Sequence, residues 1–461
     1  MVQFTTISEI LDAVEEQGID FVKFRFSDTD GMFKELDVPA ALLESAFTKG
    51  LPFDNSVGGT FKPTGSDLML KPDPRTFSFL DGCSGGSGSC CGGGSNGGGN
   101  GGSGGNKFGS VICELTFLDG QTFDGCVRSA LKLFIRKIYQ SGYTFTVSSS
   151  VSFYLLDSCT INALMTPSAE SCPKILFDSS TLAQIEDVKR DILVSLKQAE
   201  IDIISLRQTR SDGPVTVAFK EGSVLRMADN IMIFKSIVFS VAQSHGLHAS
   251  FMPQPLPESD GLSANFGFIL MKDEFNEFYH PDQDMMISDK ARGFIGGIFR
   301  HIRGICAVTN PTINSYKRIV QKRKAPYYIS WSAVDRNSLI RLPSPRGRAT
   351  KIEVQNADSS CNPYLSLLAL LSAGISGMDN NLVPIAAANF ETHDYSESEK
   401  QALSAGTLPN TLFEAIESFK GDALLKEAFG ESVSMTLIQK ESAEWNEYIG
   451  RVHLWELEKY L

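Results

Sequence analysis

The chain of 461 residues lacks two features that would place it on a membrane or on nucleic acid. No apolar run approaches the roughly 20 residues that a membrane-spanning helix requires. Basic residues are in deficit, because 54 acidic side chains outweigh 42 basic ones and give a net charge of -12. Binding to phosphate backbones requires a clustered cationic surface. We therefore expect a protein that binds neither membranes nor nucleic acid.

The cysteines also lack the spacing of a metal site or a disulfide framework. Cys83, Cys90 and Cys91 lie close together in sequence, but no histidine or paired CxxC completes a zinc set. The N-terminal segment MVQFTTISEILDAVEEQGIDF carries acidic residues where a secretory signal has a basic region. These observations predict free thiols and a cytoplasmic location.

Residues 82–105 consist almost entirely of Gly, Ser, Asn and Cys. Such a segment cannot bury enough apolar surface to offset the entropy lost on ordering. It lies between two strand-like stretches, RTFSFL and SVICELTFL, so we interpret it as a flexible insertion within one domain. It lacks the Lys-Ser/Thr ending and the following helix of a phosphate-binding P-loop, which argues against that alternative.

Helical and strand-like patterns alternate along the rest of the chain. An apolar stripe capped by Thr6 or Ser8 predicts an N-terminal helix, and alternating residues around Asp30-Gly31 predict a β-hairpin. Further helices are predicted at 126–141, 183–199, 227–245, 292–306 and 364–375, and strands at 145–156, 201–208 and 215–219. This order predicts an α+β fold with a small N-terminal sheet domain and a large antiparallel sheet flanked by helices.

Several long motifs resemble those of one enzyme family. They are FMPQPLPESDG, TNPTINSYKR, KAPYYISWSA, RATKIEVQ and NPYLSLLALL, all between Phe251 and Met378. This run resembles glutamine synthetase of the class I bacterial type, and the resemblance extends over nearly the whole chain. It implies an N-terminal β-grasp domain at 1–110, a catalytic-type domain at 111–461, and homo-oligomeric assembly into two stacked hexameric rings.

In that family the active site lies between neighbouring subunits and holds ATP, glutamate, ammonium and divalent metal ions such as Mg²⁺. Five positions that match family metal ligands carry uncharged residues here: Ser150, Ser152, Thr209, Thr216 and Asn265. Only Glu353 remains from the metal set. Divalent cations need anionic oxygen ligands, and these changes remove about four negative charges from the cage. The resemblance therefore implies that the metal site is lost, and it leaves open whether ATP and magnesium still bind.

A charge is also reversed in the flap loop. Lys324 occupies the position of the family glutamate that assists deprotonation, while Asp54 matches the aspartate that binds ammonium. A lysine ammonium cannot act as that base at its ordinary pKa. Lys324 is therefore either part of a solvated basic flap or an ion-pair partner of Asp54 that holds the loop shut.

Other positions match family residues at the glutamate and ATP-phosphate sites: Gly261, Arg318, Arg336 and Arg341. Gln254 and Gln355 replace a lysine and an arginine of the same set. The retained arginines either bind a nucleotide or carboxylate, or form ion pairs with Glu353 and Asp54, because a guanidinium serves both purposes.

Three functions follow from these residues. The first is an inactive glutamine synthetase homologue with a structural or regulatory role in nitrogen metabolism, alone or co-assembled with an active synthetase. The second is an ATP-dependent carboxylate–amine ligase, acting on glutamate with ammonia or another amine through fewer metal ions. The third is an inert shell whose Gly/Ser/Cys segment presents thiols for crosslinking.

Overall fold

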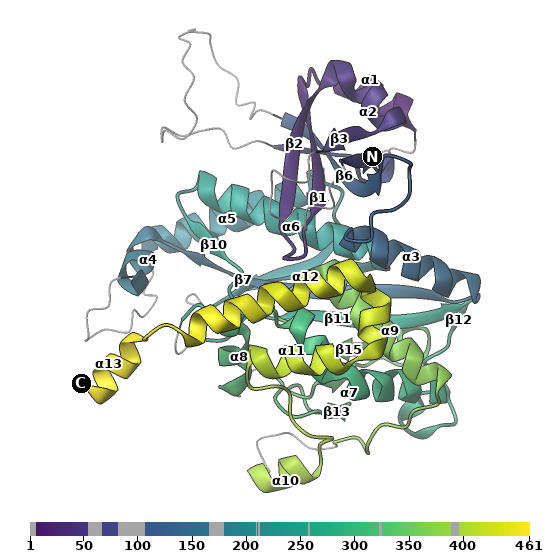
Figure 1. Ribbon diagram of the computed structural model, residues 1–461, viewed down its shortest axis with the longest axis vertical. Coiled ribbons are helices and arrows are strands. Elements are labelled where there is room, and N and C mark those ends of the chain that lie inside the picture. The colour runs from purple at the N-terminus through teal and green to yellow at the C-terminus, as the bar shows by residue number, and fades with distance from the viewer. Residues whose placement is uncertain are drawn as a thin grey trace.

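The computed structural model describes residues 6–53, 67–81, 107–165, 179–208, 210, 213–256, 259–321, 325–388 and 396–461. Two sheets organise these residues, one of six strands and one of nine, and helices cover the larger sheet (Figure 1). This arrangement confirms the predicted α+β fold. The insertion at 82–105, Asp54, Thr209 and Lys324 lie outside the described residues. None of the helices in the described ranges is long and apolar enough to cross a bilayer.

The N-terminal sheet has the order β2-β1-β6-β4-β3, with β5 also paired to β6. Its elements are α1 (Ile7–Glu16), β1 (Phe21–Ser27), β2 (Phe33–Pro39), α2 (Leu43–Lys49), β3 (Leu51–Phe53), β4 (Leu68–Pro72), β5 (Ser78–Asp81) and β6 (Lys107–Phe117). Thr6 caps α1 as predicted. The predicted hairpin is β1 and β2, whose turn contains Gly31 at a φ of 72°, a conformation that favours glycine.

The predicted boundary between residues 110 and 111 falls inside β6. That strand pairs with β1 and β4 of the N-terminal sheet and continues to Phe117. Phe123 and Cys126 also belong to the apolar core of this sheet. We therefore propose that the first domain extends to the start of α3 (Val127–Gln140).

The large sheet has the order β13-β14-β15-β11-β7-β9-β8. Its strands are β7 (Thr144–Leu156), β8 (Ile203–Gln208), β9 (Val215–Ser223), β10 (His248–Ser250), β11 (Ala264–Lys272), β12 (Phe275–Asn276), β13 (Trp331–Ser332), β14 (Ile340–Arg341) and β15 (Ile352–Val354). The pairing is antiparallel, as predicted, except between β13 and β14. Along β7 the side chains of Val147, Val151 and Phe153 enter the core, while Ser148 and Ser150 face the other side and are half-buried.

Helices fill the face of the large sheet that carries the core. They are α3, α5 (Ser179–Gln198), α6 (Val224–Ser244), α7 (Asp289–Thr309), α8 (Ile313–Val320), α9 (Pro363–Asp379), α11 (Leu412–Gly421) and α12 (Ala423–Ile449). Three further helices lie at the periphery: α4 (Ser158–Met165), α10 (Glu397–Ala402) and α13 (Leu454–Tyr460) (Figure 1). The predicted helix at 364–375 is α9, which is buried along most of its length. It packs closely on α7, since a Cβ at Gly297 would collide with the carbonyl of Ala373.

A buried arginine joins the two sheets. Arg128 at the start of α3 is 2% exposed and donates hydrogen bonds to Asp73, Glu114 and Asp229 over 2.9–3.1 Å. Asp73 and Glu114 belong to the N-terminal domain, whereas Asp229 lies on α6, and Tyr364 donates to Asp229 over 2.6 Å. Burial alone would raise the pKa of Asp73, but hydrogen bonds from Arg75 and the charge of Arg128 lower it to about 2.

Replacing Arg128 with Met should strongly destabilise the protein. The substitution leaves buried carboxylates without their counter-charge, which costs roughly 3–5 kcal/mol. Urea unfolding followed by circular dichroism measures this loss. Arg190→Met is the control, because its partner Asp187 is exposed and such pairs contribute less than about 1 kcal/mol. Equal effects of the two substitutions would contradict the role given to Arg128.

The low pKa of Asp73 predicts a specific loss of stability in acid. A carboxyl whose pKa falls from 3.8 to about 2 on folding stabilises the native state fully above pH 3.8. That contribution, about 2 kcal/mol, disappears as the pH falls from about 4 to about 2. Asp73→Asn should therefore be less stable than the parent chain at pH 6, and the gap should narrow below pH 4. Free energies of unfolding across this range test it, and a constant gap would refute it.

Candidate functional site

The register of the large sheet brings the predicted metal positions onto one face. Asn265 of β11 lies opposite Ser150 of β7, and Thr216 of β9 lies opposite Ser152. Gly267 lies opposite both Ser148 and Glu353. Because directly opposed residues point to the same side of a sheet, these side chains share the face opposite the helical core. The sequence prediction that these positions form one site is consistent with this placement.

These side chains line a cavity of about 280 Å³. Its lining includes Ser148, Ser150, Ser205, Arg207, Thr216, Asn265, Lys351 and Glu353. Ser152 lies at its edge, where its hydroxyl is 3.0 Å from the hydroxyl of Thr216. The polar groups that line the cavity are thus mostly hydroxyls, with a single carboxylate.

Two cationic residues in this cavity were missed by the sequence reasoning. Arg207 projects from β8, opposite Thr216, and is exposed. Lys351 lies two residues before Glu353 and so points to the same face of the sheet. A Cβ at Gly267 would lie 2.6 Å from Ser148 Oγ and 3.4 Å from Lys351 Cδ, so the lysine stem crosses β11 toward β7. The spacing of two residues between Lys351 and Glu353 on one strand could have indicated that Lys351 faces the cavity.

Glu353 is held beside a basic neighbour. Its Oε1 accepts a hydrogen bond of 2.9 Å from Gln355 Nε2. Arg341 of β14 lies directly opposite Glu353, so both side chains emerge on the cavity face. Arg341 Nε is buried and has no hydrogen-bond partner among the described residues. No ion pair within 4.0 Å joins Arg341 to Glu353, and Arg341 does not line the cavity, so its Nε–H is a buried donor that an anionic partner could satisfy.

Gly261 and Arg318 come together at a separate place. A Cβ at Gly261 would lie 2.7 Å from Arg318 Cγ and 3.0 Å from Gln254 Oε1, so only glycine permits this approach. Arg318 is 4% exposed and donates to the carbonyl of Asn356 over 3.1 Å. Burial lowers its pKa. Gln254 donates to the carbonyls of Leu256 and Ser259, which fixes the loop that leads to Gly261.

Arg336 is the one remaining candidate among the described residues that belongs to neither the cavity nor the pair of Gly261 and Arg318. Arg336 is exposed in the turn between β13 and β14 and does not line the cavity. Asp54, Thr209 and Lys324 lie outside the described residues, so the flap alternatives stay predictions.

The donor set of the cavity does not fit a cluster of two or more divalent metal ions. Each Mg²⁺ is usually bound through one or two carboxylates together with water and substrate phosphates, so a cluster requires several anionic ligands. Here one carboxylate stands against two cationic side chains. Among the described residues no group of three or more His, Cys, Asp or Glu could hold a metal ion.

The fold and the site define a class: a two-domain α+β protein with a polar cavity on the open face of its larger sheet. Residues 18–83 match the family model described as "Glutamine synthetase, beta-Grasp domain", and residues 124–460 match "Glutamine synthetase, catalytic domain". The chain belongs to the glutamine synthetase family.

Curated relatives and solved structures agree with this assignment. The chain is 36% identical to glutamine synthetase of Methanosarcina mazei, over 100% of this chain and 99% of the relative. It is 32% identical to glutamine synthetase of Thermotoga maritima, over 99% of both. The solved structure named "GmaS/ADP complex-Conformation 1" superposes with a TM-score of 0.82 at 23% identity, over 98% of each chain. That last likeness bears on the fold alone.

From the charge of the cavity we predict that the chain binds magnesium weakly. Returning anionic side chains to the cavity should strengthen that binding. Wild-type protein should give no saturable heat with millimolar MgCl₂ in isothermal titration. The triple variant Ser150→Glu, Thr216→Glu, Asn265→His should bind at least about tenfold more tightly, because it returns anionic ligands to the cage.

The matched control places the same residue types outside the cavity. Thr48→Glu, Thr144→Glu and Asn380→His change exposed positions by the same charge. This control should behave as the wild type does. Sub-millimolar magnesium affinity of the wild-type protein would show that the cavity, as it stands, is a metal site.

Proposed function

We propose that this chain is a glutamine synthetase homologue that does not catalyse ATP-dependent ligation. The observation that carries the proposal is the charge of the cavity, in which Arg207 and Lys351 outweigh Glu353. Transfer of a phosphoryl group to a carboxylate requires two anions to approach, and the metal ions of such sites neutralise their charge. Basic side chains can attract these anions but do not replace the metal geometry that aligns them.

We further propose a structural or regulatory role in nitrogen and glutamine metabolism, in the cytoplasm. The chain would act either as a homo-oligomer of stacked hexameric rings or as a subunit co-assembled with an active synthetase. The C-terminal helix α13 supports assembly, because Leu454, Trp455 and Tyr460 are 49–74% exposed in the single chain. Exposed apolar residues grouped in this way are typical of protein interfaces.

A second function is favoured by a different observation. Arg341 keeps a buried Nε without a partner among the described residues, beside the single carboxylate of Glu353. This pair supports an ATP-dependent carboxylate–amine ligase in which Arg341 binds an anionic substrate and Glu353 binds one metal ion. ATP and Mg²⁺ would then be its cofactors.

Phosphate release from ATP separates the two functions. With magnesium, glutamate and ammonium present, the purified chain should release no phosphate above the rate without glutamate. An active glutamine synthetase assayed in parallel provides the positive control. Glutamate-dependent release that is abolished by Glu353→Gln and by Arg341→Met would overturn the first proposal and establish the second. Titration with ATP alone reports whether a nucleotide site remains.

A further inference from the structure

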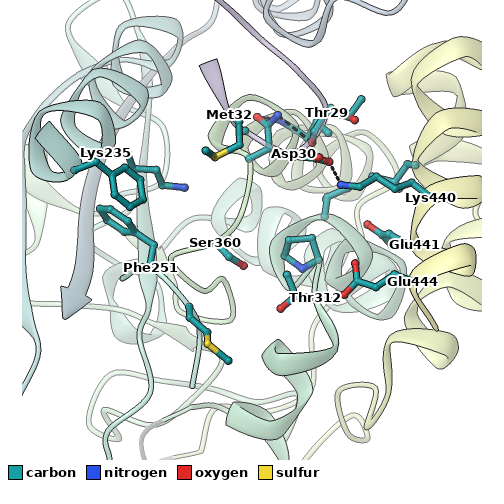
Figure 2. A pocket seen from close by; sticks show the side chains of 18 residues that line it. Thr29, Asp30, Met32, Lys235, Phe251, Thr312, Ser360, Lys440, Glu441 and Glu444 are labelled. Carbon is teal, nitrogen blue, oxygen red and sulfur yellow. Dashed lines mark hydrogen bonds and ion pairs between the residues drawn. The ribbon is translucent and has the colours of Figure 1, made fainter. Parts of the chain in front are cut away.

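A second cavity, of about 320 Å³, lies between the two domains. It is formed by the turn of the β1–β2 hairpin, by α6, by the start of α8 and of α9, and by α12 (Figure 2). It shares no lining residue with the cavity around Glu353. A volume near 300 Å³ is at the lower end of the range for small-molecule sites.

One wall of this cavity carries a buried ammonium group. Lys235 of α6 is 8% exposed and donates a hydrogen bond of 2.9 Å to the carbonyl of Cys361. Its Nζ also lies 5.7 Å from the centre of the Phe251 ring. Burial lowers the pKa of Lys235, an effect that the charge of Asp358 opposes. Two of the three N–H groups of this ammonium have no hydrogen-bond acceptor among the described residues.

The opposite wall carries a buried carboxyl group. Glu441 of α12 is 4% exposed, and its Oε2 has no hydrogen-bond partner within the described ranges. Burial raises the pKa of Glu441 well above its ordinary value. Lys440 is already paired with Asp30 of the hairpin turn, and Glu444 accepts from the backbone of Ile313. An unsatisfied buried polar atom costs about 1–3 kcal/mol of folding free energy, so its presence in a native structure requires an explanation.

The ammonium group of Lys235 and the carboxyl group of Glu441 do not form a hydrogen bond or ion pair with each other. Figure 2 shows Lys235 and Phe251 on one side of the cavity and Lys440, Glu441 and Glu444 on the other. No ion pair joins Lys235 to Glu441. Between them the walls are mainly apolar and include Met32, Phe239, Met252, Leu365 and Leu437. The cavity thus presents a donor at one side, an acceptor at the other, and apolar surface between them.

We propose that this cavity binds a small zwitterion, a molecule with one ammonium and one carboxylate at the two ends of an apolar body. The ammonium would donate to Glu441 Oε2, and the carboxylate would accept from Lys235 Nζ. Both contacts are charge-assisted hydrogen bonds, which are the stronger kind in a site shielded from water. The apolar body would lie against the methionine, phenylalanine and leucine side chains.

Three probes with one apolar body test the charge requirement. 6-Aminohexanoate carries both charges at the two ends of an apolar chain, hexylamine only the ammonium, and hexanoate only the carboxylate. Isothermal titration of the full chain should detect binding of 6-aminohexanoate, with each single-charge probe weaker by at least about tenfold. Equal affinities for the three probes, or no binding of any probe at millimolar concentration, would overturn the proposal.

Two near-isosteric variants test the assigned residues. Glu441→Gln and Lys235→Met should each weaken binding of 6-aminohexanoate by at least about tenfold. Glu447→Gln, an exposed position on the same helix, should leave it unchanged. Thermal unfolding of each variant establishes that it folds, and the probe series on the parent chain does not depend on any variant.

Proton release gives a readout that a purely structural role would not produce. Glu441 faces Lys440 and Glu444 on α12, Asp30 on the hairpin and Lys235 across the cavity. Its raised pKa favours the protonated form, and an arriving ammonium group would favour the carboxylate. Binding of 6-aminohexanoate should therefore release protons, seen as a dependence of the binding heat on the ionisation enthalpy of the buffer. Release that persists in Glu441→Gln would assign the proton to another group and refute the contact.

Discussion

The arrangement of the two domains depends on one buried cation. Arg128 satisfies carboxylates from both domains at once, and a guanidinium can do so because its planar fork offers several donors. Asn362 adds a second tie, since its side chain donates to the carbonyls of Asp28 and Thr29 in the hairpin turn. Together these contacts hold the hairpin turn over α9 and α12. The cavity that contains Lys235 and Glu441 exists because the hairpin is held there.

The large sheet, by contrast, does not depend on the residues that face its open side. Its register is maintained by backbone hydrogen bonds and by core-facing side chains such as Val147, Val151 and Phe153. Ser150 and Thr216 on the other face could therefore lose or gain charge with little effect on the fold. This separation explains how a chain 36% identical to a named glutamine synthetase keeps the scaffold while its cavity differs in charge from what a metal site requires.

The sequence predicted the elements well because their signals are local. The nearly continuous apolar run of α9 and the alternation along β7 each appear within a single segment, and both elements are where they were expected. The predicted domain boundary falls within β6, because the composition does not change where that strand leaves the core of the first sheet, and we propose the start of α3 in its place. Lys235 and Glu441 are more than 200 residues apart, and no local pattern indicates that they share a cavity. The same holds for Arg207 and Lys351, which only the strand order brings together.

The retained arginines do not all require a ligand to explain them. Arg318 packs its stem against Gly261 and donates to the Asn356 carbonyl, so its place in the interior is accounted for by the chain itself. Its hydrogen bond goes to a backbone carbonyl and not to Glu353, and whether it also binds a nucleotide or carboxylate stays a prediction. Arg341 differs, since its buried Nε lacks a partner among the described residues while its strand neighbour is Glu353. A buried donor without an acceptor costs free energy when the site is empty. When a ligand is bound, the same donor can form a hydrogen bond to it. Arg341 is therefore the retained arginine whose place the chain itself does not explain, while Arg207 and Lys351 are the cations that line the cavity.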